Sequence, residues 1–278
     1  MNPVVIQMLS RYPLTTDSQR LRALREVVQE IGLAGLYRAG FFNEAAFYGG
    51  TCLRIFHHLP RFSEDLDFSL LKSNPGLDMS PYLQTLSEEF ASLGIKVEMK
   101  LKKKAIQTAI TSVFLKTSTM IMQLDVATNK PVKIKFEVDT DPPLGFATEE
   151  KLLLQPFSAY VKCFILADLF AGKMHALLFR QWQQRVKGRD WFDLVWYVQQ
   201  SIPLHLAHLA RRAIQSGHWP AERPFDVKSA QTLLQERISR LDIDQARADI
   251  ERFLPSDSNI GPWSREYFQQ VAERVRYK

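Results

Sequence analysis

The sequence predicts an α+β fold with two lobes: a mixed lobe with a small mixed sheet over residues 1–155, then a helical lobe over residues 156–278. Alternation of apolar and polar residues, which is typical of half-buried strands, marks the first lobe. Apolar residues at helical spacing dominate the chain beyond Cys163. A chain of 278 residues is also long enough for two lobes of ordinary domain size.

The first elements alternate between helix and strand. Leu21, Leu24 and Ile31 recur at helical spacing and predict the first helix. A short apolar strand follows it and ends in a glycine pair, after which a second, shorter helix begins. The expected segments are Ser18–Ala34 (helix), Ala45–Tyr48 (strand), Thr51–His58 (helix), Asp67–Leu71 (strand) and Tyr82–Leu93 (helix).

Strands and then helices make up the rest. Three or four strands are expected at Ile95–Leu101, Ala109–Leu115, Met120–Asp125 and Val132–Val138. Lys102–Lys104 would form a charged hairpin tip, and Asp141-Pro142-Pro143 would end the last strand because proline cannot donate to a sheet. The segment 145–156 would then lead to helices at Phe164–Arg180, Asp190–Gln199, Ser229–Ile238 and Pro262–Val275.

The composition excludes several classes of protein. With 46% apolar and 24% charged residues the chain is typical of a soluble globular protein. No apolar run approaches the roughly 20 residues that a membrane span needs, and Met1–Arg11 does not have the pattern of a signal peptide. The two cysteines, Cys52 and Cys163, are too few for a disulfide framework or a metal cluster, so we expect a reducing, cytoplasmic location.

Positive charge is concentrated in the second lobe. The whole chain has a formal net charge of +6. Residues 156–278 hold 18 Lys and Arg against 13 Asp and Glu, a net charge of +5. This excess suits a polyanionic partner such as RNA, through contacts with phosphates. A solvated basic surface without a partner explains it equally well.

The glycine pair is the first candidate for a binding site. Gly49 and Gly50 lie between an expected strand and the start of an expected helix at Thr51. Glycine lets the backbone turn sharply and approach a ligand closely. The N–H groups at a helix start favour a phosphate. The alternative is a simple turn.

Two aspartates on the next strand are candidate metal ligands. Asp65 and Asp67 are two residues apart, so both side chains would point to the same side of a strand. Two like charges held that close favour a cation between them, and such oxygen ligands suit Mg²⁺. The alternative is a pair of acids at a polar strand edge. Leu66 and Phe68, which flank Asp67, favour a strand that packs into a core.

A third acid follows at the end of the last expected strand. Glu137 lies between Phe136 and Val138, and on a neighbouring strand it could face the same site. It would then complete the ligands of a two-metal centre. Alternatively, Lys133, Lys135 and Glu137 form the solvent face of an edge strand.

Cations and one further acid of the second lobe are also candidates. Lys173, on the helix 164–180, could neutralise the leaving pyrophosphate. Arg185, Lys187 and Arg189 form a basic cluster before Asp190, which lies near a helix start and could simply cap it. In the first lobe, Arg54 would brace the glycine turn, and Arg61 and Ser63 are candidate phosphate contacts.

The order of these motifs resembles the polymerase-β-like nucleotidyltransferase superfamily. Longer runs are similar to the AbiEii/AbiGii toxin family of nucleotidyltransferases. These runs are Ala46–Phe56 (AFYGGTCLRIF), Leu59–Leu70 (LPRFSEDLDFSL), Lys173–Leu178 (KMHALL) and Arg185–Leu194 (RVKGRDWFDL). The resemblance implies a nucleotidyltransferase toxin of an abortive-infection or type IV toxin–antitoxin locus, with a winged-helix antitoxin as its partner. It also implies that Asp190 is a catalytic acid, which could activate the acceptor hydroxyl.

Together these features predict an enzyme that transfers a nucleoside monophosphate from an NTP with Mg²⁺ as cofactor. Asp65, Asp67 and Glu137 would hold two metal ions, while Gly49, Gly50, Thr51 and Lys173 would bind phosphates. Some relatives in the family add nucleotides to the 3′ end of tRNA, so tRNA is the preferred acceptor. A protein acceptor and a binding module without catalysis remain alternatives. A DNA-binding protein is disfavoured because no helix-turn-helix with a basic recognition helix is present in the sequence.

Overall fold

The computed structural model describes residues 2–103, 119–126, 132–180, 186–255, 258 and 260–278. Of the expected features, the strand Ala109–Leu115, Lys104 and Arg185 lie outside these residues. None of the described helices is both long and apolar enough to cross a membrane.

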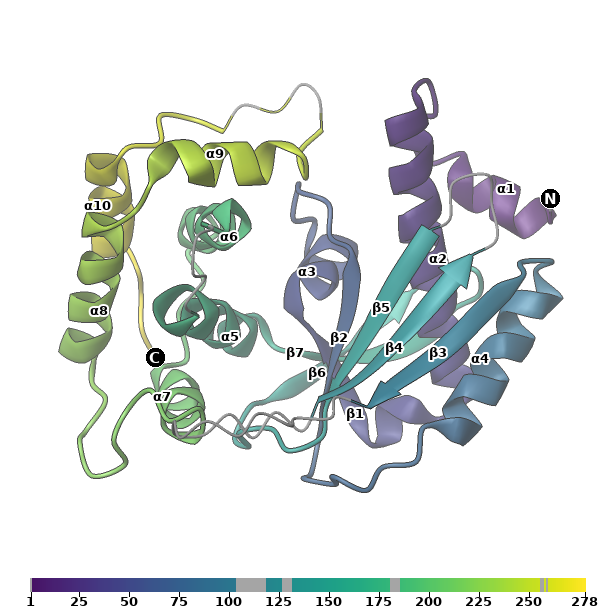
Figure 1. Cartoon of the computed structure of the whole chain (residues 1–278), viewed down its shortest axis with the longest axis horizontal. Helices are drawn as coiled ribbons and strands as arrows, with labels where there is room; N and C mark the ends of the chain where they lie inside the picture. The colour runs from purple at the N-terminus through teal and green to yellow at the C-terminus, as the bar shows by residue number, and fades with distance from the viewer. Residues whose placement is uncertain (1, 104–118, 127–131, 181–185, 256–257, 259) are drawn as a thin grey trace.

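Seven described strands form one mixed sheet (Figure 1). Their order across the sheet is β3-β4-β5-β2-β1-β7-β6. The pairs β2–β5 and β1–β7 are parallel, and the other neighbours are antiparallel. The strands are β1 (Ala45–Tyr48), β2 (Asp65–Leu70), β3 (Val97–Lys103), β4 (Thr119–Val126), β5 (Val132–Asp139), β6 (Thr148–Leu153) and β7 (Ala159–Phe164).

Of the helices in the first part of the chain, the first packs on the second, and the others pack on this sheet. They are α1 (Pro3–Leu9), α2 (Asp17–Arg38), α3 (Gly49–His57) and α4 (Ser80–Ser92). A capping box between Thr16 and Gln19 begins α2, satisfying two backbone groups at its first turn. Gly32 of α2 lies so close to the Phe136 ring of β5 that a Cβ would be 3.2 Å from it. The small residue therefore lets the helix sit directly on the sheet.

The second part of the chain is helical and lies beside the sheet in Figure 1. It consists of α5 (Leu166–Phe179), α6 (Gly188–Gln199), α7 (Leu206–Gln215), α8 (Val227–Ser239), α9 (Ile243–Glu251) and α10 (Arg265–Glu273). Seen in Figure 1, α5 and α6 are viewed nearly end-on, between α3 and the pair α8 and α10. One continuous hydrophobic cluster joins buried side chains of both parts, including Phe47 and Phe68 from the sheet and Phe170 and Trp196 from the helices.

The sheet extends further along the chain than the sequence predicts. The segment 145–156 was expected to be a connection, but it contains β6, and β7 follows it. Ala159, Val161 and Cys163 of β7 are buried on alternate positions, and the strand pairs in parallel with β1. The turn at Asp141-Pro142-Pro143 therefore does not end the last strand. The division after residue 155 stays a prediction, and the sheet itself ends at Phe164.

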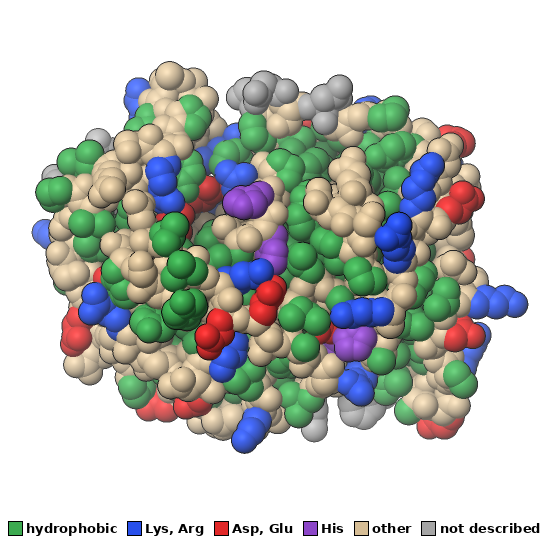
Figure 2. Space-filling view, turned by 180° about the vertical axis from the view of Figure 1, so that it is seen from behind, with side chains coloured by type: hydrophobic (Ala, Val, Ile, Leu, Met, Phe, Trp, Pro, Cys, Tyr) green, Lys and Arg blue, Asp and Glu red, His purple; other side chains and the backbone are tan. Residues whose placement is uncertain are grey.

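Two smaller expectations are also corrected. Lys102 and Lys103 belong to β3 instead of a hairpin tip. The helix α1 was not expected from the sequence, whereas α7 and α9 lie in the part expected to be almost entirely helical, without bounds of their own. On the face seen from behind, side chains of both charges are interspersed among hydrophobic ones, and the described residues form no broad basic patch there (Figure 2).

Candidate active site

A cavity of about 390 Å³ lies where the sheet meets the helices α5 and α6. Residues from the start of α3, from β2 and β5, from the loop 59–64 and from the beginning of α6 line it together. We call it the first cavity. Of the site residues expected from the sequence, it contains Gly49, Gly50, Arg61, Ser63, Asp65, Asp67, Glu137, Lys173 and Asp190.

The glycine turn is required by geometry. Gly49 has a φ of +84°, a conformation that side chains with a Cβ rarely adopt. A Cβ at this position would also run into the carboxylate of Asp67. At Gly50 a Cβ would be 2.8 Å from a guanidinium nitrogen of Arg61 and 2.9 Å from the Ser63 hydroxyl. Both glycines thus bring the start of α3 close to the acids, and the N–H groups of that first turn suit a phosphate.

The two aspartates are held side by side on β2. In the parallel register with β5, Asp67 lies opposite Glu137 and Asp65 lies opposite Lys135. Because β4 covers the other edge of β5, Glu137 is not on an edge strand, as the alternative interpretation supposed. Burial, followed by the charges of Glu137 and Asp65, raises the pKa of Asp67 to about 7. Burial also raises the pKa of Asp65. A cation placed beside this pair would relieve the repulsion.

The donor set fits one Mg²⁺ better than a complete three-carboxylate centre. Glu137 forms an ion pair with Lys135, its neighbour on the same face of β5. Within the described part of the chain, no three His, Cys, Asp or Glu side chains are arranged to hold a metal ion. Mg²⁺ is commonly held by one or two carboxylates and completes its shell with water and substrate phosphates. Asp65 and Asp67 meet that requirement, whereas Glu137 would first have to leave Lys135.

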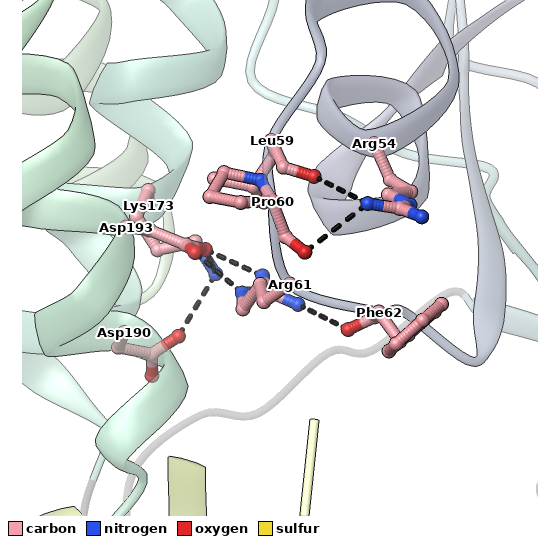
Figure 3. A network of polar contacts seen from close by, with 8 residues as sticks. All are labelled: Arg54, Leu59, Pro60, Arg61, Phe62, Lys173, Asp190 and Asp193. Atoms are coloured by element: carbon pink, nitrogen blue, oxygen red, sulfur yellow. Dashed lines mark hydrogen bonds and ion pairs between the residues drawn. The ribbon is translucent and has the colours of Figure 1, made fainter. Parts of the chain in front are cut away.

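A buried ionic network forms another part of the wall (Figure 3). Arg61 donates from Nε and Nη2 to both carboxylate oxygens of Asp193, at 2.5 and 2.6 Å. Lys173 Nζ lies 2.9 Å from Asp190 Oδ1 and 2.8 Å from Asp193 Oδ2. Arg61 is 2% exposed and Asp193 is fully buried. We call these four residues the Lys173 network; it ties the loop after α3 to α5 and α6.

The charges within this network hold one another ionised. Burial alone would raise the pKa of Asp193, but Arg61 and Lys173 lower it below its usual value. Burial likewise opposes the charge of Lys173, and the two aspartates nevertheless raise its pKa. Asp193 was not singled out as a site residue from the sequence. Its spacing of three residues from Asp190, which puts both on one face of α6, is the signal that could have identified it.

Two residues expected to contact phosphates have other partners. Thr51 is buried and does not line the cavity; its hydroxyl donates to the backbone carbonyl of Asp65. Thr51 therefore fixes α3 against β2. The guanidinium of Arg61 is engaged by Asp193 and by the Phe62 carbonyl. Its position against Gly50 makes it a support of the glycine turn, and its guanidinium is not presented freely to a ligand.

Arg54 braces the site, as expected from its position. It is ion-paired with Glu26 of α2, at 2.8 Å, and donates to the carbonyls of Leu59 and Pro60, both at 3.1 Å (Figure 3). These contacts hold the loop that carries Arg61. Asp190 lies in the first turn of α6, but the N-cap position belongs to Lys187, so Asp190 is not the capping residue.

Besides Arg61, Lys173 and the Lys135 that pairs with Glu137, the described lining of the first cavity contains three more cations: Arg180, Lys187 and Arg189. Lys187 and Arg189 belong to the basic cluster expected from the sequence, whereas Arg180, the C-cap of α5, was not singled out. Burial, together with the positive charges of Arg189 and Arg180, lowers the pKa of Lys187 to about 8. These groups repel one another in the absence of an anion. A triphosphate bound between the cations and the glycine turn would remove that repulsion.

Comparison with known proteins agrees with this geometry. The family described as "Nucleotidyl transferase AbiEii toxin, Type IV TA system" matches residues 32–274. That range includes the glycine turn, Asp65, Asp67 and the Lys173 network. Among curated proteins, no sequence matches the chain.

Two solved structures with TM-scores above 0.5 share the fold at low sequence identity. The crystal structure of JHP933 from Helicobacter pylori is 15% identical, covers 91% of this chain and 89% of its own, and has a TM-score of 0.55. A second crystal structure from H. pylori, described as that of a provisionally assigned nucleotidyltransferase, is 16% identical over 89% of this chain and 92% of its own, with a TM-score of 0.53. MenT4, a nucleotidyltransferase toxin from Mycobacterium tuberculosis, is 17% identical over 98% of both chains, with a TM-score of 0.48.

Proposed function

Because the chain belongs to the AbiEii family of nucleotidyl transferase toxins of type IV toxin–antitoxin systems, we propose that the first cavity transfers a nucleoside monophosphate from an NTP to an acceptor hydroxyl. In this reaction the acceptor oxygen forms a bond to the α-phosphorus. The bond from that phosphorus to the bridging oxygen breaks, and pyrophosphate leaves with the electron pair. The proton of the acceptor hydroxyl must pass to a base.

Asp65 and Asp67 would hold Mg²⁺, and Glu137 would join them as a third acid once it separates from Lys135. When bound, Mg²⁺ would neutralise charge on the phosphates, and a second ion would require Glu137 as a further ligand. Burial first, and then the charges of Glu137 and Asp65, raise the pKa of Asp67, and a cation bound beside these carboxylates would offset both effects.

The residues around the acids would bind and orient the triphosphate. The N–H groups at Gly49 and Gly50 are placed to donate to its oxygens, beside the carboxylate pair. Arg180, Lys187 and Arg189 supply positive charge that the leaving pyrophosphate requires. Lys173 adds to this positive field from the wall of the cavity, where its side chain is 16% exposed.

Asp190 is the base we assign to the acceptor hydroxyl. Its Oδ1 accepts from Lys173, and its Oδ2 would take the proton. Lys173 and Asp193 would position the carboxylate through their contacts in the buried network. This role requires the acceptor to approach from the side of α6, opposite the glycine turn.

The acceptor we propose is the 3′ end of a tRNA. The net charge of +5 over residues 156–278 and the cations around the start of α6 support a polyanionic acceptor. Membership of the family implies an antitoxin partner. We propose that this antitoxin is a winged-helix protein and that the enzyme acts in the cytoplasm. A protein hydroxyl is the alternative acceptor.

The observation that carries the proposal is the meeting, in one cavity, of the glycine turn, the carboxylate pair and the cations Arg180, Lys187 and Arg189. The test is incubation of the purified protein with total bacterial RNA, Mg²⁺ and each NTP in turn, labelled on its α-phosphate. A labelled band of tRNA size that is lost on addition of EDTA and in Asp67→Asn supports tRNA as acceptor. Label on protein alone would replace tRNA with a protein acceptor.

A further inference from the structure

A second cavity, of about 220 Å³, lies on the other side of the α6 start. It is bounded by the end of α5, the first turn of α6 and the end of α8. Four cations contribute to its lining: Arg180, Lys187, Arg237 and Arg240. The rest of the wall is largely apolar and includes Leu177, Trp191 and Leu241.

The two cavities share part of their walls. Ala176, Arg180, Lys187 and Asp190 line both of them. Asp190, the base assigned above, is therefore reached from either side. If part of a substrate occupied the second cavity, the group attached to that part would lie at Asp190. Asp190 also borders the first cavity, which holds the carboxylate pair.

The second cavity differs from the first in its chemistry. Asp190 is the one acid in its described lining, and this acid is ion-paired with Lys173. The cavity lacks a glycine turn and a carboxylate pair, so its described residues provide no site for a metal-bound triphosphate. Its positive charges and apolar wall instead suit a phosphodiester with its attached sugar and base.

The positive charges of this cavity are fixed in place and crowded. Arg237 donates to the carbonyl oxygens of Leu178 and Arg180, at 2.7 and 2.8 Å, so its guanidinium is held at the end of α5. Arg240, the C-cap of α8, is exposed. Burial and the neighbouring Arg240 lower the pKa of Arg237. A bound anion would offset this crowding.

From this geometry we infer that the second cavity binds the phosphodiester backbone of the acceptor RNA, just before the nucleotide whose 3′ hydroxyl reaches Asp190. This inference rests on the proposed nucleotidyl transfer and adds the place and the class of the acceptor. Four cations around a small cavity match a single-stranded nucleic acid end. A neutral peptide segment with a Ser, Thr or Tyr hydroxyl would bring no negative charge to balance these cations.

The test uses Arg240→Glu in the full-length protein, with Lys228→Glu as the matched control. Both residues are exposed and both lie at α8, Lys228 in its first turn and Arg240 at its end. Arg240→Lys is the conservative variant. Three quantities are measured: the KM and kcat for deacylated bacterial tRNA, the Kd for a single-stranded RNA with a free 3′ hydroxyl at several salt concentrations, and the thermal shift caused by a non-hydrolysable NTP with Mg²⁺.

Arg240→Glu should raise the KM and the Kd for RNA about tenfold or more, which corresponds to about 1.4 kcal/mol. The slope of log Kd against log salt should become shallower by about 0.7 for each phosphate that the variant no longer neutralises. In Arg240→Glu the thermal shift caused by the non-hydrolysable NTP with Mg²⁺ should equal that of the wild type, and kcat should change less than KM. For Arg240→Lys, the KM and the Kd for RNA should stay within about threefold of the wild-type values. For Lys228→Glu, both should equal the wild-type values.

Equal RNA binding by Arg240→Glu and Lys228→Glu would overturn the inference. The inference would also be overturned if label were transferred to a protein acceptor, and if Arg240→Glu impaired that transfer without changing the Kd for RNA. If the wild type transferred no nucleotide to RNA, the proposed acceptor would fail. The Kd measurements would then still decide whether this cavity binds RNA.

Discussion

At the scale of single residues, Asp67 connects the parts of the candidate site. It lies against Gly49, opposite Glu137 in the sheet, and two residues from Asp65 on the same side of β2. The backbone of Gly49 and the carboxylates of Glu137 and Asp65 therefore lie close to the Asp67 carboxylate. Burial and these neighbouring charges raise the pKa of Asp67 to about 7. The charge of Asp67 is therefore unfavourable for the metal-free fold, and it is the charge that the proposed metal site requires.

The substitution Asp67→Asn separates these two effects. It should lower nucleotidyl transfer by at least about a hundredfold, because metal stabilisation of the transition state contributes several kcal/mol. In metal-free buffer at pH 8 it should raise the free energy of unfolding by roughly 1–3 kcal/mol, since a buried, repelled charge is removed. Urea unfolding measures the second effect. Equal stability of the two proteins would contradict our account of the carboxylate pair.

Gly49→Ala tests the glycine turn, with Gly94→Ala as its control. Both glycines have a positive φ, +84° and +71°, so both variants carry a backbone strain of about 1 kcal/mol or more. Only at Gly49 would the Cβ meet the Asp67 carboxylate, whereas nothing lies within 4 Å at Gly94. We expect Gly49→Ala to abolish transfer and Gly94→Ala to keep it. Equal activity of the two variants in a transfer assay would show that the close approach is unimportant.

The residues predicted from the sequence are those whose spacing is local. The aspartate pair and the glycine pair are close in sequence, and the structure brings both to the first cavity. The contacts of Arg61 and Thr51 could not be predicted in this way. Arg61 reaches Asp193, which is 132 positions away, and the Thr51 hydroxyl binds a backbone carbonyl. Such partners depend on how distant elements pack, which no local pattern reveals.

At the scale of elements, the Lys173 network joins three segments: the loop after α3, α5 and α6. We expect Asp193→Ala to lower the free energy of unfolding by about 3–5 kcal/mol, because it removes the carboxylate that pairs with the buried Arg61 and leaves Lys173 paired with Asp190. Urea denaturation gives the difference. The exposed Glu236→Ala on α8 is the control and should change stability by no more than about 0.5 kcal/mol. A loss of the same size in both variants would mean that the network does not hold these elements together.

The elements found from the sequence are those with long, regular patterns. The helix α2 and the strand β5 appear close to their predicted bounds. By contrast, β7 was missed because its short alternation precedes the long helical pattern of α5. Its place in the sheet comes from a parallel pairing with β1, more than 100 positions earlier. Crossover pairings of this kind are set by tertiary packing and leave little trace in local composition.

At the scale of the whole molecule, the first cavity lies at the contact between the sheet and the helical part, and one hydrophobic cluster spans both. We therefore expect thermal unfolding in a single transition. A non-hydrolysable NTP with Mg²⁺ should stabilise the fold by about 2.7 kcal/mol at a hundred times its Kd. Calorimetry would detect both effects. Two separate transitions, with the nucleotide shifting only one, would mean that the two parts are independent domains.

The most direct test of nucleotidyl transfer compares the same NTP labelled on its α-phosphate and on its γ-phosphate, in parallel reactions with bacterial RNA and Mg²⁺. Our account predicts that the α-label becomes covalently attached to the acceptor while the γ-label is released as pyrophosphate. Neither label should be attached in Asp67→Asn. Attachment of the γ-label, or attachment of the α-label that does not depend on Asp67, would contradict a reaction centred on the Asp65 and Asp67 pair.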